Sequence, residues 1–299
     1  MRLDTSPAVC AVVVAYGDMG GLKRCITALR DCPGVSIIVV VDNGGDRLIE
    51  LACRALGAIY VDPGANVGYA RGANLAVEVV QASISHVLIV NPDLVLHDLA
   101  TVLRALQQSE AAIATGCLRR ADGSLELNCR VVATPFREFL GAVLGTRVYA
   151  SHAPTLDGAV ESVEQAAGSL LLMKRETWEI LRGFDERFEL YYEDVDLCRR
   201  ANGEGGVVRV RAIVADHVGG ASYRKNRSQA YVALRISRLR YLRKWYGTRG
   251  AFVAFFLTLI EVMSRGVTRQ KEGWRTRMAA VVAQTRELSE PGTISALGR

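Results

Sequence analysis

The first third of the chain alternates between short apolar runs and segments with helical spacing. The apolar runs, rich in Val and Ile, cover 8–17, 36–45, 58–64 and 85–93. Runs that are apolar on both faces are typical of buried parallel strands. Helical spacing falls between them, at 19–31 and near 70–82. This alternation predicts an α/β fold with a doubly wound, mainly parallel sheet, as in Rossmann-like nucleotide-binding proteins.

The rest of the chain supplies a second set of predicted elements. They are a helix from Thr101 to about 109, a strand, an Asp-Gly turn and a strand over 111–127, a strand and a short helix over 168–186, a pair of strands over 205–220 that ends at His217, and helices from 228 onward. Periodicity is weak from 130 to 165, which we interpret as a mobile segment beside the site. We expect two domains, a sheet domain over 1–225 and a helical region over 226–299.

Polar side chains stand at the ends of the predicted strands. In chain order they are Tyr16 and Asp18, then Asp42, Asn43 and Asp46, then Asn91 and Asp93. In open α/β sheets, ligands bind beyond the carboxyl ends of the strands. We therefore expect these side chains to converge on one crevice.

Charge is distributed unevenly along the chain. Residues 1–200 hold 19 Lys and Arg against 25 Asp and Glu, a net −6, whereas residues 201–299 hold 18 against 6, a net +12. A basic block of this kind fits nucleic acid or an anionic membrane surface. No nucleic-acid recognition motif accompanies it, so we expect no nucleic-acid partner.

An apolar run at 251–260 lies inside this basic block. It is shorter than the roughly 20 residues that span a bilayer. We expect it to lie in the membrane interface, or to be a buried helix or a contact in a homo-oligomer. The first residues show no signal-peptide pattern, and the seven cysteines have no metal-binding or CxxC spacing, which together favour a reducing cytosol.

Two glycine-rich segments follow predicted strands. In VDNGGD (41–46), Asp42 could contact a base or a ribose, since glycines let the backbone approach a ligand. A tight turn needs the same Asn-Gly chemistry. In GANVGYARGAN (64–74), a helix start at Gly68 could present backbone N–H groups and Arg71 to a diphosphate. The alternative is an ordinary helix-start turn, because the glycine spacing is not GxGxxG.

Asp93 and His217 are candidate metal ligands. Asp93 follows a strand and a proline in NPDLVL (91–96), and divalent cations prefer carboxylate oxygens. His217 stands at another predicted strand end and could share one Mg²⁺ or Mn²⁺ with it. A turn aspartate and a structural histidine are the alternatives.

The segment LYYEDVDLCRR (190–200) crowds three carboxylates beside two tyrosines. Acids in the first turn of a helix that begins near Glu193 would suit the helix dipole. Alternatively, aromatic walls raise the pKa of Asp194 toward that of a useful general base. Asp196 fits a structural acid held near Arg199 and Arg200.

The order of these motifs resembles glycosyltransferase family 2, which has the GT-A fold. The matching segments, over roughly 8–225, are AVVVAYG, VDNGG, ANVGYARGAN, VNPD, GSLLLMKRE, GFDERFELYYEDVDLCRR and H-x-G-G-x-S. Within the family, the chain is most similar to bacterial rhamnosyltransferases that use dTDP-rhamnose and build surface polysaccharide on a lipid-diphosphate carrier.

The resemblance implies a role for each candidate residue. Asp194 is the catalytic base, with Glu193 beside it as an acceptor contact. Asp93 and His217 bind a divalent cation, Mg²⁺ or Mn²⁺. Asp42 reads the nucleobase. Donor binding is assigned to Ala15, Tyr16, Asp42, Asn66, Gly68, Arg71, Asn91 and Asp93.

This sequence departs from the family pattern at two motifs. Asn91 replaces the first acid of the metal-binding Asp-x-Asp motif, a form that related rhamnosyltransferases share. The usual Asp-Asn-Gly-Ser reads DNGG, so a serine contact is missing. The first departure bears on metal use and the second on donor binding.

The resemblance therefore implies an inverting hexosyltransferase, with rhamnose as the best match. We expect it to act at the inner face of the cell membrane on a lipid-diphosphate-linked glycan, with its basic C-terminal region on the anionic surface. A nucleotidyltransferase is one rival, although YGDMGGLKR (16–24) poorly matches the glycine-rich basic loop of such enzymes. A non-catalytic nucleotide-sugar-binding protein is the other.

Overall fold

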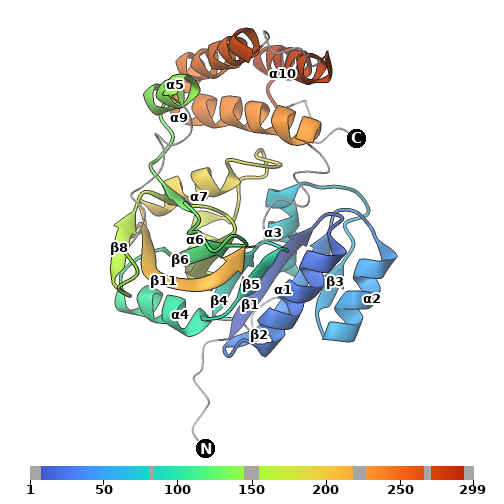
Figure 1. Ribbon diagram of the computed structural model, residues 1–299, viewed down its shortest axis with the longest axis vertical. Helices are drawn as coiled ribbons and strands as arrows, with labels where there is room; N and C mark the ends of the chain where they lie inside the picture. The colour runs from blue at the N-terminus through green and yellow to red at the C-terminus, as the bar shows by residue number, and fades with distance from the viewer. Residues whose placement is uncertain (1–7, 81–83, 145–154, 218–226, 266–270, 293–299) are drawn as a thin grey trace, which may run out of the picture.

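A central sheet with helices on both faces forms the main body of the protein (Figure 1). The computed structural model describes residues 8–80, 84–144, 155–217, 227–265 and 271–292. The helices α5 (Pro135–Leu144), α9 (Arg227–Arg265) and α10 (Lys271–Ser289) gather above one end of this sheet.

The strands match the apolar runs of the sequence. Their bounds are β1 Val9–Ala15, β2 Val35–Asp42, β3 Ile59–Val61, β4 His86–Val90, β5 Leu94–Leu96, β6 Ile113–Arg120, β8 Val160–Val163, β10 Leu170–Lys174 and β11 Val207–His217. They lie in the order β3-β2-β1-β4-β10-β6-β11-β5, with β8 beside β11. β1 to β4 are parallel to one another, whereas β10 runs antiparallel to both β4 and β6. The expected α/β, doubly wound sheet is confirmed.

The helices pack on the sheet through apolar faces. Their bounds are α1 Met19–Asp31, α2 Arg47–Leu56, α3 Tyr69–Val79, α4 Leu99–Gln108, α6 Arg175–Leu181 and α7 Glu193–Ala201. α1, α2 and α4 cover one face, and α3, α6 and α7 cover the other. In α1 the buried positions Leu22, Cys25, Ile26 and Leu29 recur with helical spacing, which is why this segment forms an amphipathic helix.

Strand direction brings the polar strand ends to one edge of the sheet. β11 is parallel to β6, which has the same direction as β1, β2 and β4. His217, the last residue of β11, and Asn91, which follows β4, therefore lie at the same edge. β5 and β10 run the opposite way, so the residues before them, Asp93 and Gly168, also lie at that edge. The strand ends that carry these residues therefore share one edge of the sheet, and their convergence on one crevice stays a prediction.

Several predicted elements differ from the structure. The helix α2 was not anticipated, although Asp46 caps its start and Gly57, with φ of 76°, ends it. The second strand after the Asp-Gly turn is only an isolated bridge between Arg119 and Leu125.

The prediction of a strand pair over 205–220 is also wrong. The described part of this segment forms one long strand, β11, whose pairing with β6 has two register shifts. The weakly patterned segment 130–165 contains α5 and the strands β8 and β9 (Gln165–Ala166). β9 pairs with β7 (Cys129–Arg130) in a separate two-stranded sheet. Residues 145–154, and the H-x-G-G-x-S motif beyond His217, lie outside the described residues.

The helix α9 is broken at Gly247, where φ is 65°. Its two halves pack against each other, since Arg238 lies 2.8 Å from Glu261 and 2.7 Å from the hydroxyl of Thr258. α10 lies alongside, and the side chain of Gln284 donates to the carbonyl oxygen of Arg235. The chain therefore forms a small bundle after the sheet domain.

Polarity is inverted in the second half of α9. Thr258 and Glu261 are buried, whereas Phe252, Phe256 and Met263 are 53%, 58% and 67% exposed. By length and composition alone, Arg227–Met263 is the one stretch among the described helices that could cross a membrane. A third of its apolar window is buried. The break at Gly247 and the buried ion pairs around Glu261 instead favour two short helices.

Candidate active site

Asp93 and His217 face each other at the sheet edge. The Oδ1 atom of Asp93 lies 3.1 Å from Nε2 of His217, and Nδ1 of the same ring lies 2.6 Å from Oε2 of Glu126. Burial opposes protonation of the ring, but its bonds to Asp93 and Glu126 outweigh burial and raise the pKa of His217 to about 10. The imidazolium thus occupies the space between two carboxylates.

Once Nε2 of His217 has lost its proton, this pair presents one oxygen and one nitrogen of the kinds that bind a divalent cation. A metal-binding histidine typically uses one ring nitrogen for the metal and gives the other to a carboxylate, which fixes the orientation of the ring. Here Nε2 faces Asp93 and Nδ1 is held by Glu126. No group of three or more His, Cys, Asp or Glu side chains suited to a metal occurs in the part of the chain that the structure describes. Phosphate oxygens and water would complete the shell, as is common for Mg²⁺.

Asp194 lies in the first turn of α7, close to the start of β10. Its Oδ2 atom accepts a hydrogen bond of 2.9 Å from the backbone N–H of Gly168, and Oδ1 accepts one from Val195. Burial raises the pKa of Asp194, and these two bonds oppose the rise because they stabilise the carboxylate. The side chain remains partly exposed. Asp194 is therefore a carboxyl group that two backbone N–H groups hold in place and whose pKa is raised.

Glu193 is the more buried of the two adjacent acids, at 6% exposure. Its Oε2 atom has no hydrogen-bond partner among the residues described. Burial, followed by the charge of Asp194, raises the pKa of Glu193 well above its usual range. Burial and the neighbouring charge therefore disfavour ionisation of Glu193, whereas the two backbone hydrogen bonds to Asp194 favour its charged form.

The chain enters α7 through a strained turn. Tyr191 and Tyr192 have φ of 67° and 66°, in the left-handed region that residues other than glycine rarely adopt. The hydroxyl of Tyr192 donates to Glu138 on α5 at 2.7 Å, which helps to hold this conformation. The turn places Glu193 and Asp194 at the amino end of the helix, and such strain is typical of functional sites.

Asp196 joins α7 to α9. It is fully buried and accepts hydrogen bonds from Arg200 at 2.8 Å, Lys244 at 2.5 Å and Trp245 at 2.9 Å. Arg199 instead lies over the ring of Trp245, 4.2 Å from its centroid. A buried carboxylate with three donors has a structural role, in agreement with the expectation for this residue.

The residues assigned to the nucleoside lie at the ends of β1 and β2. The carbonyl oxygen of Ala15 accepts from the N–H of Asn43, and Tyr16 is exposed beside Gly44. Asp42 is fully buried, and its carboxylate accepts from the N–H groups of Gly44 and Asp46. Asp42 thus holds its own loop, and its contact with a nucleobase stays a prediction.

The glycine-rich segment forms the start of α3. Gly68 has φ of 85°, and a Cβ there would lie 2.6 Å from the carbonyl oxygen of Glu189, so only glycine fits. The side chain of Asn66 accepts from the N–H of Gly68. Arg71 pairs with Glu186 at 3.0 Å and Glu78 at 3.2 Å. A diphosphate contact by Arg71 would require it to leave these partners.

Asn91 is linked to Asp194 through a network of hydrogen bonds. Its N–H donates to the carbonyl oxygen of Ser169, and its side-chain oxygen lies 3.4 Å from the hydroxyl of Tyr69. That hydroxyl also donates to the carbonyl oxygen of Gly168 at 3.0 Å. The N–H of Gly168 in turn donates to Asp194, so hydrogen bonds join the end of β4 and the start of β10 to the first turns of α3 and α7.

Three residues of the site escaped the sequence reasoning. Tyr69 lies within the glycine-rich motif, where a tyrosine carries no distinct signal. Glu126 falls in the second strand predicted over 111–127, and Arg130 begins the weakly patterned segment, so neither stood out as a site residue. The charge of Arg130 acts on Asp194 and lowers its pKa, and the exposed Arg130 side chain has no hydrogen bond or ion pair with any described residue.

Sequence comparison links the chain to sugar transfer. The model of the family described as "Glycosyltransferase like family 2" matches residues 7–232. Rhamnosyltransferase WbbL of Escherichia coli (strain K12) is 25% identical over 253 residues, which cover 79% of this chain and 93% of that protein. The N-acetylglucosaminyl-diphospho-decaprenol L-rhamnosyltransferase of Mycobacterium tuberculosis (strain ATCC 25618 / H37Rv) is 28% identical over 217 residues, 65% and 70% of the two chains.

A solved structure shares the fold. It is the mannosyltransferase PcManGT from Pyrobaculum calidifontis in complex with GDP-Man and Mn²⁺, with a TM-score of 0.51 and 14% identity. The match covers 96% of this chain and 88% of that chain. At this level of identity the likeness shows the fold alone.

Proposed function

This chain belongs to glycosyltransferase family 2 and has the GT-A fold, as its motifs predicted, and we propose that it transfers rhamnose from dTDP-rhamnose to a hydroxyl of a lipid-diphosphate-linked glycan. The observation that carries the proposal is the placement of Asp194 at the same sheet edge as the Asp93–His217 pair. The names of the two rhamnosyltransferase relatives support the donor, and that of the mycobacterial relative supports the acceptor.

The two sides of the site have different tasks in this reaction. Asp194 takes the proton of the acceptor hydroxyl as that oxygen attacks the anomeric carbon. The bond from this carbon to the nucleoside diphosphate breaks on the opposite face, so the configuration inverts. A general base must lie within about 3 Å of the proton that it removes. The N–H of Gly168 fixes the direction of the Asp194 carboxylate for this task.

Asp93 and His217 would hold a Mg²⁺ or Mn²⁺ ion, which when bound neutralises the negative charge that develops on the leaving diphosphate. Glu126 orients the ring of His217 through Nδ1. The neighbouring side chain of Asn91 is already bonded to Tyr69, which supports a positioning role for it in place of the missing first acid.

A screen of nucleotide sugars with and without lipid-linked acceptor tests this function. We expect transfer from dTDP-rhamnose to a polyprenyl-diphosphate-linked sugar, and slow donor hydrolysis without acceptor. Binding of the donor without hydrolysis or transfer to any acceptor would favour the non-catalytic alternative. Formation of a nucleotide sugar from a sugar phosphate and a nucleoside triphosphate would favour the nucleotidyltransferase alternative.

The variant Arg130→Gln is expected to move the acid limb of the pH profile to higher pH. Asp194 must be ionised to act as the base, and burial already raises its pKa. Because the charge of Arg130 lowers that pKa, its removal raises the pKa further, and activity is lost at a higher pH as acid is added. The measurement is kcat/KM against pH.

Arg104→Gln is the matched control, since Arg104 is an exposed arginine on α4 whose side-chain hydrogen bonds to described residues stay within its own helix. Its profile should coincide with that of the unmodified protein. An Arg130→Gln profile that also coincides would contradict the assigned influence on Asp194.

The helical region 226–299 is assigned to the membrane surface, and 1–225 to catalysis. The exposed apolar side chains of α9 have neighbours of the same kind on α5, where Phe136 is 68% exposed, and on α10, where Trp274 is 50% exposed. The +12 charge of the C-terminal third complements an anionic bilayer, where each basic residue contributes about 1 kcal/mol. We place the protein at the inner face of the cell membrane, bound in the interface without crossing it.

Substituting both Phe252 and Phe256 by Ser should reduce flotation with anionic vesicles. The wild-type association should weaken in high salt, because part of it is electrostatic. Leu48→Ser with Leu51→Ser removes two exposed apolar residues from α2 and serves as the control. Recovery of all wild-type protein in the soluble fraction at low salt would contradict membrane binding. Loss of a dimer in the phenylalanine variant would instead assign the face to a homo-oligomer.

A further inference from the structure

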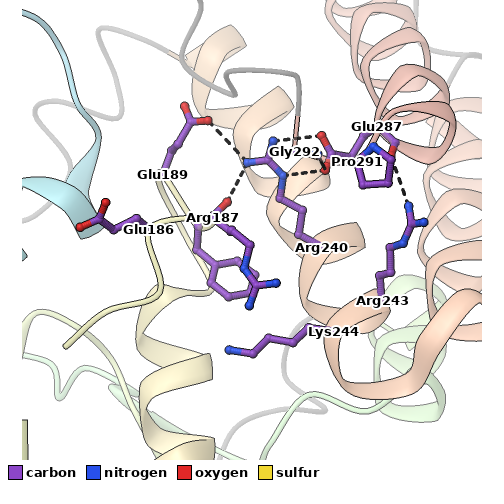
Figure 2. Close-up of a pocket in the computed structure, with 10 residues that line it drawn as sticks. Glu186, Arg187, Glu189, Arg240, Arg243, Lys244, Glu287, Pro291 and Gly292 are labelled. Atoms are coloured by element: carbon purple, nitrogen blue, oxygen red, sulfur yellow. Dashed lines mark hydrogen bonds and ion pairs between the residues drawn. The ribbon is translucent and has the colours of Figure 1, made fainter. Parts of the chain in front are cut away.

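A cavity of about 670 Å³ lies between the loop that precedes α7 and the helices α9 and α10. Figure 2 shows Glu186, Arg187 and Glu189 on the loop side and Arg240 and Arg243 on the opposite side. Nothing in the reaction described so far uses this cavity, although its loop leads directly to Glu193 and Asp194.

The lining contains four cations and three carboxylates, but the carboxylates already have partners. Glu287 pairs with Arg240 at 3.0 Å, and Glu189 lies 3.5 Å from the same guanidinium. Glu186 pairs with Arg71, outside the lining. The acids of the cavity are therefore neutralised by cations other than Arg243.

Arg243 is the lining cation that has no carboxylate partner among the described residues. Its only hydrogen bond there is a long one, 3.4 Å, to the backbone carbonyl oxygen of Glu287 (Figure 2). The side chain is only partly exposed, so its remaining N–H groups are held at the wall of the cavity. A guanidinium with free donors matches the paired oxygens of a phosphate group.

The cavity is tied to the catalytic residues on its loop side. Lys244 lines it and donates to Asp196, which is on the same helix as the base and two residues beyond it. The carbonyl oxygen of Glu189 accepts from the N–H of Tyr69, whose hydroxyl reaches Gly168 beside Asp194. An anion in the cavity would thus lie between the base and the helices with exposed apolar side chains.

We propose that this cavity binds the diphosphate of the lipid-linked acceptor, with Arg243 as its principal contact. The inference rests on the proposed function, because it assigns a place to one part of that substrate. An acceptor of this class has a sugar that must reach Asp194 and a lipid that stays in the bilayer. Its diphosphate lies between the two, as the cavity lies between the catalytic loop and the helices α9 and α10, which carry the exposed apolar side chains.

Binding of inorganic pyrophosphate tests the cavity independently of sugar transfer. Calorimetry is done with a chelator present, which removes the metal that a donor diphosphate would need at Asp93 and His217. Arg243→Gln should weaken binding by about tenfold to a hundredfold, the usual effect of losing a hydrogen bond to a charged group. Arg249→Gln removes an equal charge from an exposed position of α9 and should leave binding unchanged. Equal binding by both variants and the wild type would overturn the inference.

Transfer kinetics then distinguish the sources of the diphosphate. Arg243→Gln should raise KM about tenfold or more for a short-chain alkyl-diphosphate-linked acceptor, and should leave KM unchanged for the matching alkyl glycoside without diphosphate. An equal rise for both acceptors, or no rise for either, would overturn the inference while leaving the transferase function in place. Loss of binding to phosphatidylglycerol vesicles with an unchanged KM would assign Arg243 to the lipid surface and also overturn it.

Discussion

Replacing Asp194 by Asn is expected to reduce transfer by about 10²–10⁴-fold, the usual contribution of a general base, while donor binding survives. The amide oxygen of Asn can still accept the hydrogen bond from Gly168, so the local structure should persist. The amide cannot take a proton from the acceptor hydroxyl, so only the chemical step is lost. The measurements are single-turnover transfer from the nucleotide sugar and calorimetry of donor binding on the same preparation.

Glu193→Gln is the matched control, and it decides which of the adjacent acids is the base. Burial raises the pKa of Glu193, which favours its protonated form, and glutamine resembles a protonated glutamate in shape and in hydrogen bonding. We therefore expect a smaller effect from Glu193→Gln than from Asp194→Asn. Normal turnover by Asp194→Asn, or a greater loss in Glu193→Gln, would reverse the assignment.

The sequence predicts the strand ends well because buried parallel strands carry their own signal. β1, β2 and β4 are apolar on both faces, and the polar residue that follows each one must lie beyond the sheet. The side chains of Asn91 and Asp93 could therefore be placed at one edge before the structure was known. The direction of β11, which brings His217 to the same edge, follows from long-range pairing with β6.

Arg130 and Glu126 show what local patterns do not contain. Arg130 belongs to a strand of two residues that exists only because β9 pairs with it, 35 positions later at Gln165. Glu126 follows an isolated bridge and is placed by contact with His217. A two-residue strand is too short to show a period, and the strand predicted around Glu126 is reduced to an isolated bridge, so sequence spacing could not mark either side chain as part of the site.

Some motif residues form hydrogen bonds within their own loops, and the sequence does not distinguish this role from ligand binding. Asp42 and Asn66 both accept hydrogen bonds from nearby backbone N–H groups in the glycine-rich segments. The same chemistry defines a tight turn and a donor-binding loop, as the two readings of VDNGG anticipated. In the C-terminal helices, the sequence showed mixed basic and apolar residues. Only the structure shows that Arg238 and Glu261 are buried and that Phe256 is exposed to solvent.

Substituting Asp93 or His217 by Ala is expected to abolish Mn²⁺-dependent binding of the nucleoside diphosphate and to lower transfer at least about a hundredfold. These two side chains provide the facing oxygen and nitrogen of the site, and within the described residues no third His, Cys, Asp or Glu completes a metal-binding group with them. Loss of either one should therefore leave too few protein ligands for the ion. Electron paramagnetic resonance of Mn²⁺ with added dTDP measures binding directly, without reference to activity.

A graded series tests whether the effect follows the geometry of the pair. Glu126→Gln should weaken Mn²⁺ binding less, by about 10–100-fold, because Glu126 acts through the orientation of the His217 ring. Asp98→Asn is the control, since Asp98 caps α4 by accepting from the N–H of Thr101 and has no place at the site. Equal binding by the Asp93 and His217 variants and the control would assign this pair a purely structural role. Because His217 would then serve as a fixed cation between Asp93 and Glu126, its Ala variant should lose stability while metal dependence stays unchanged.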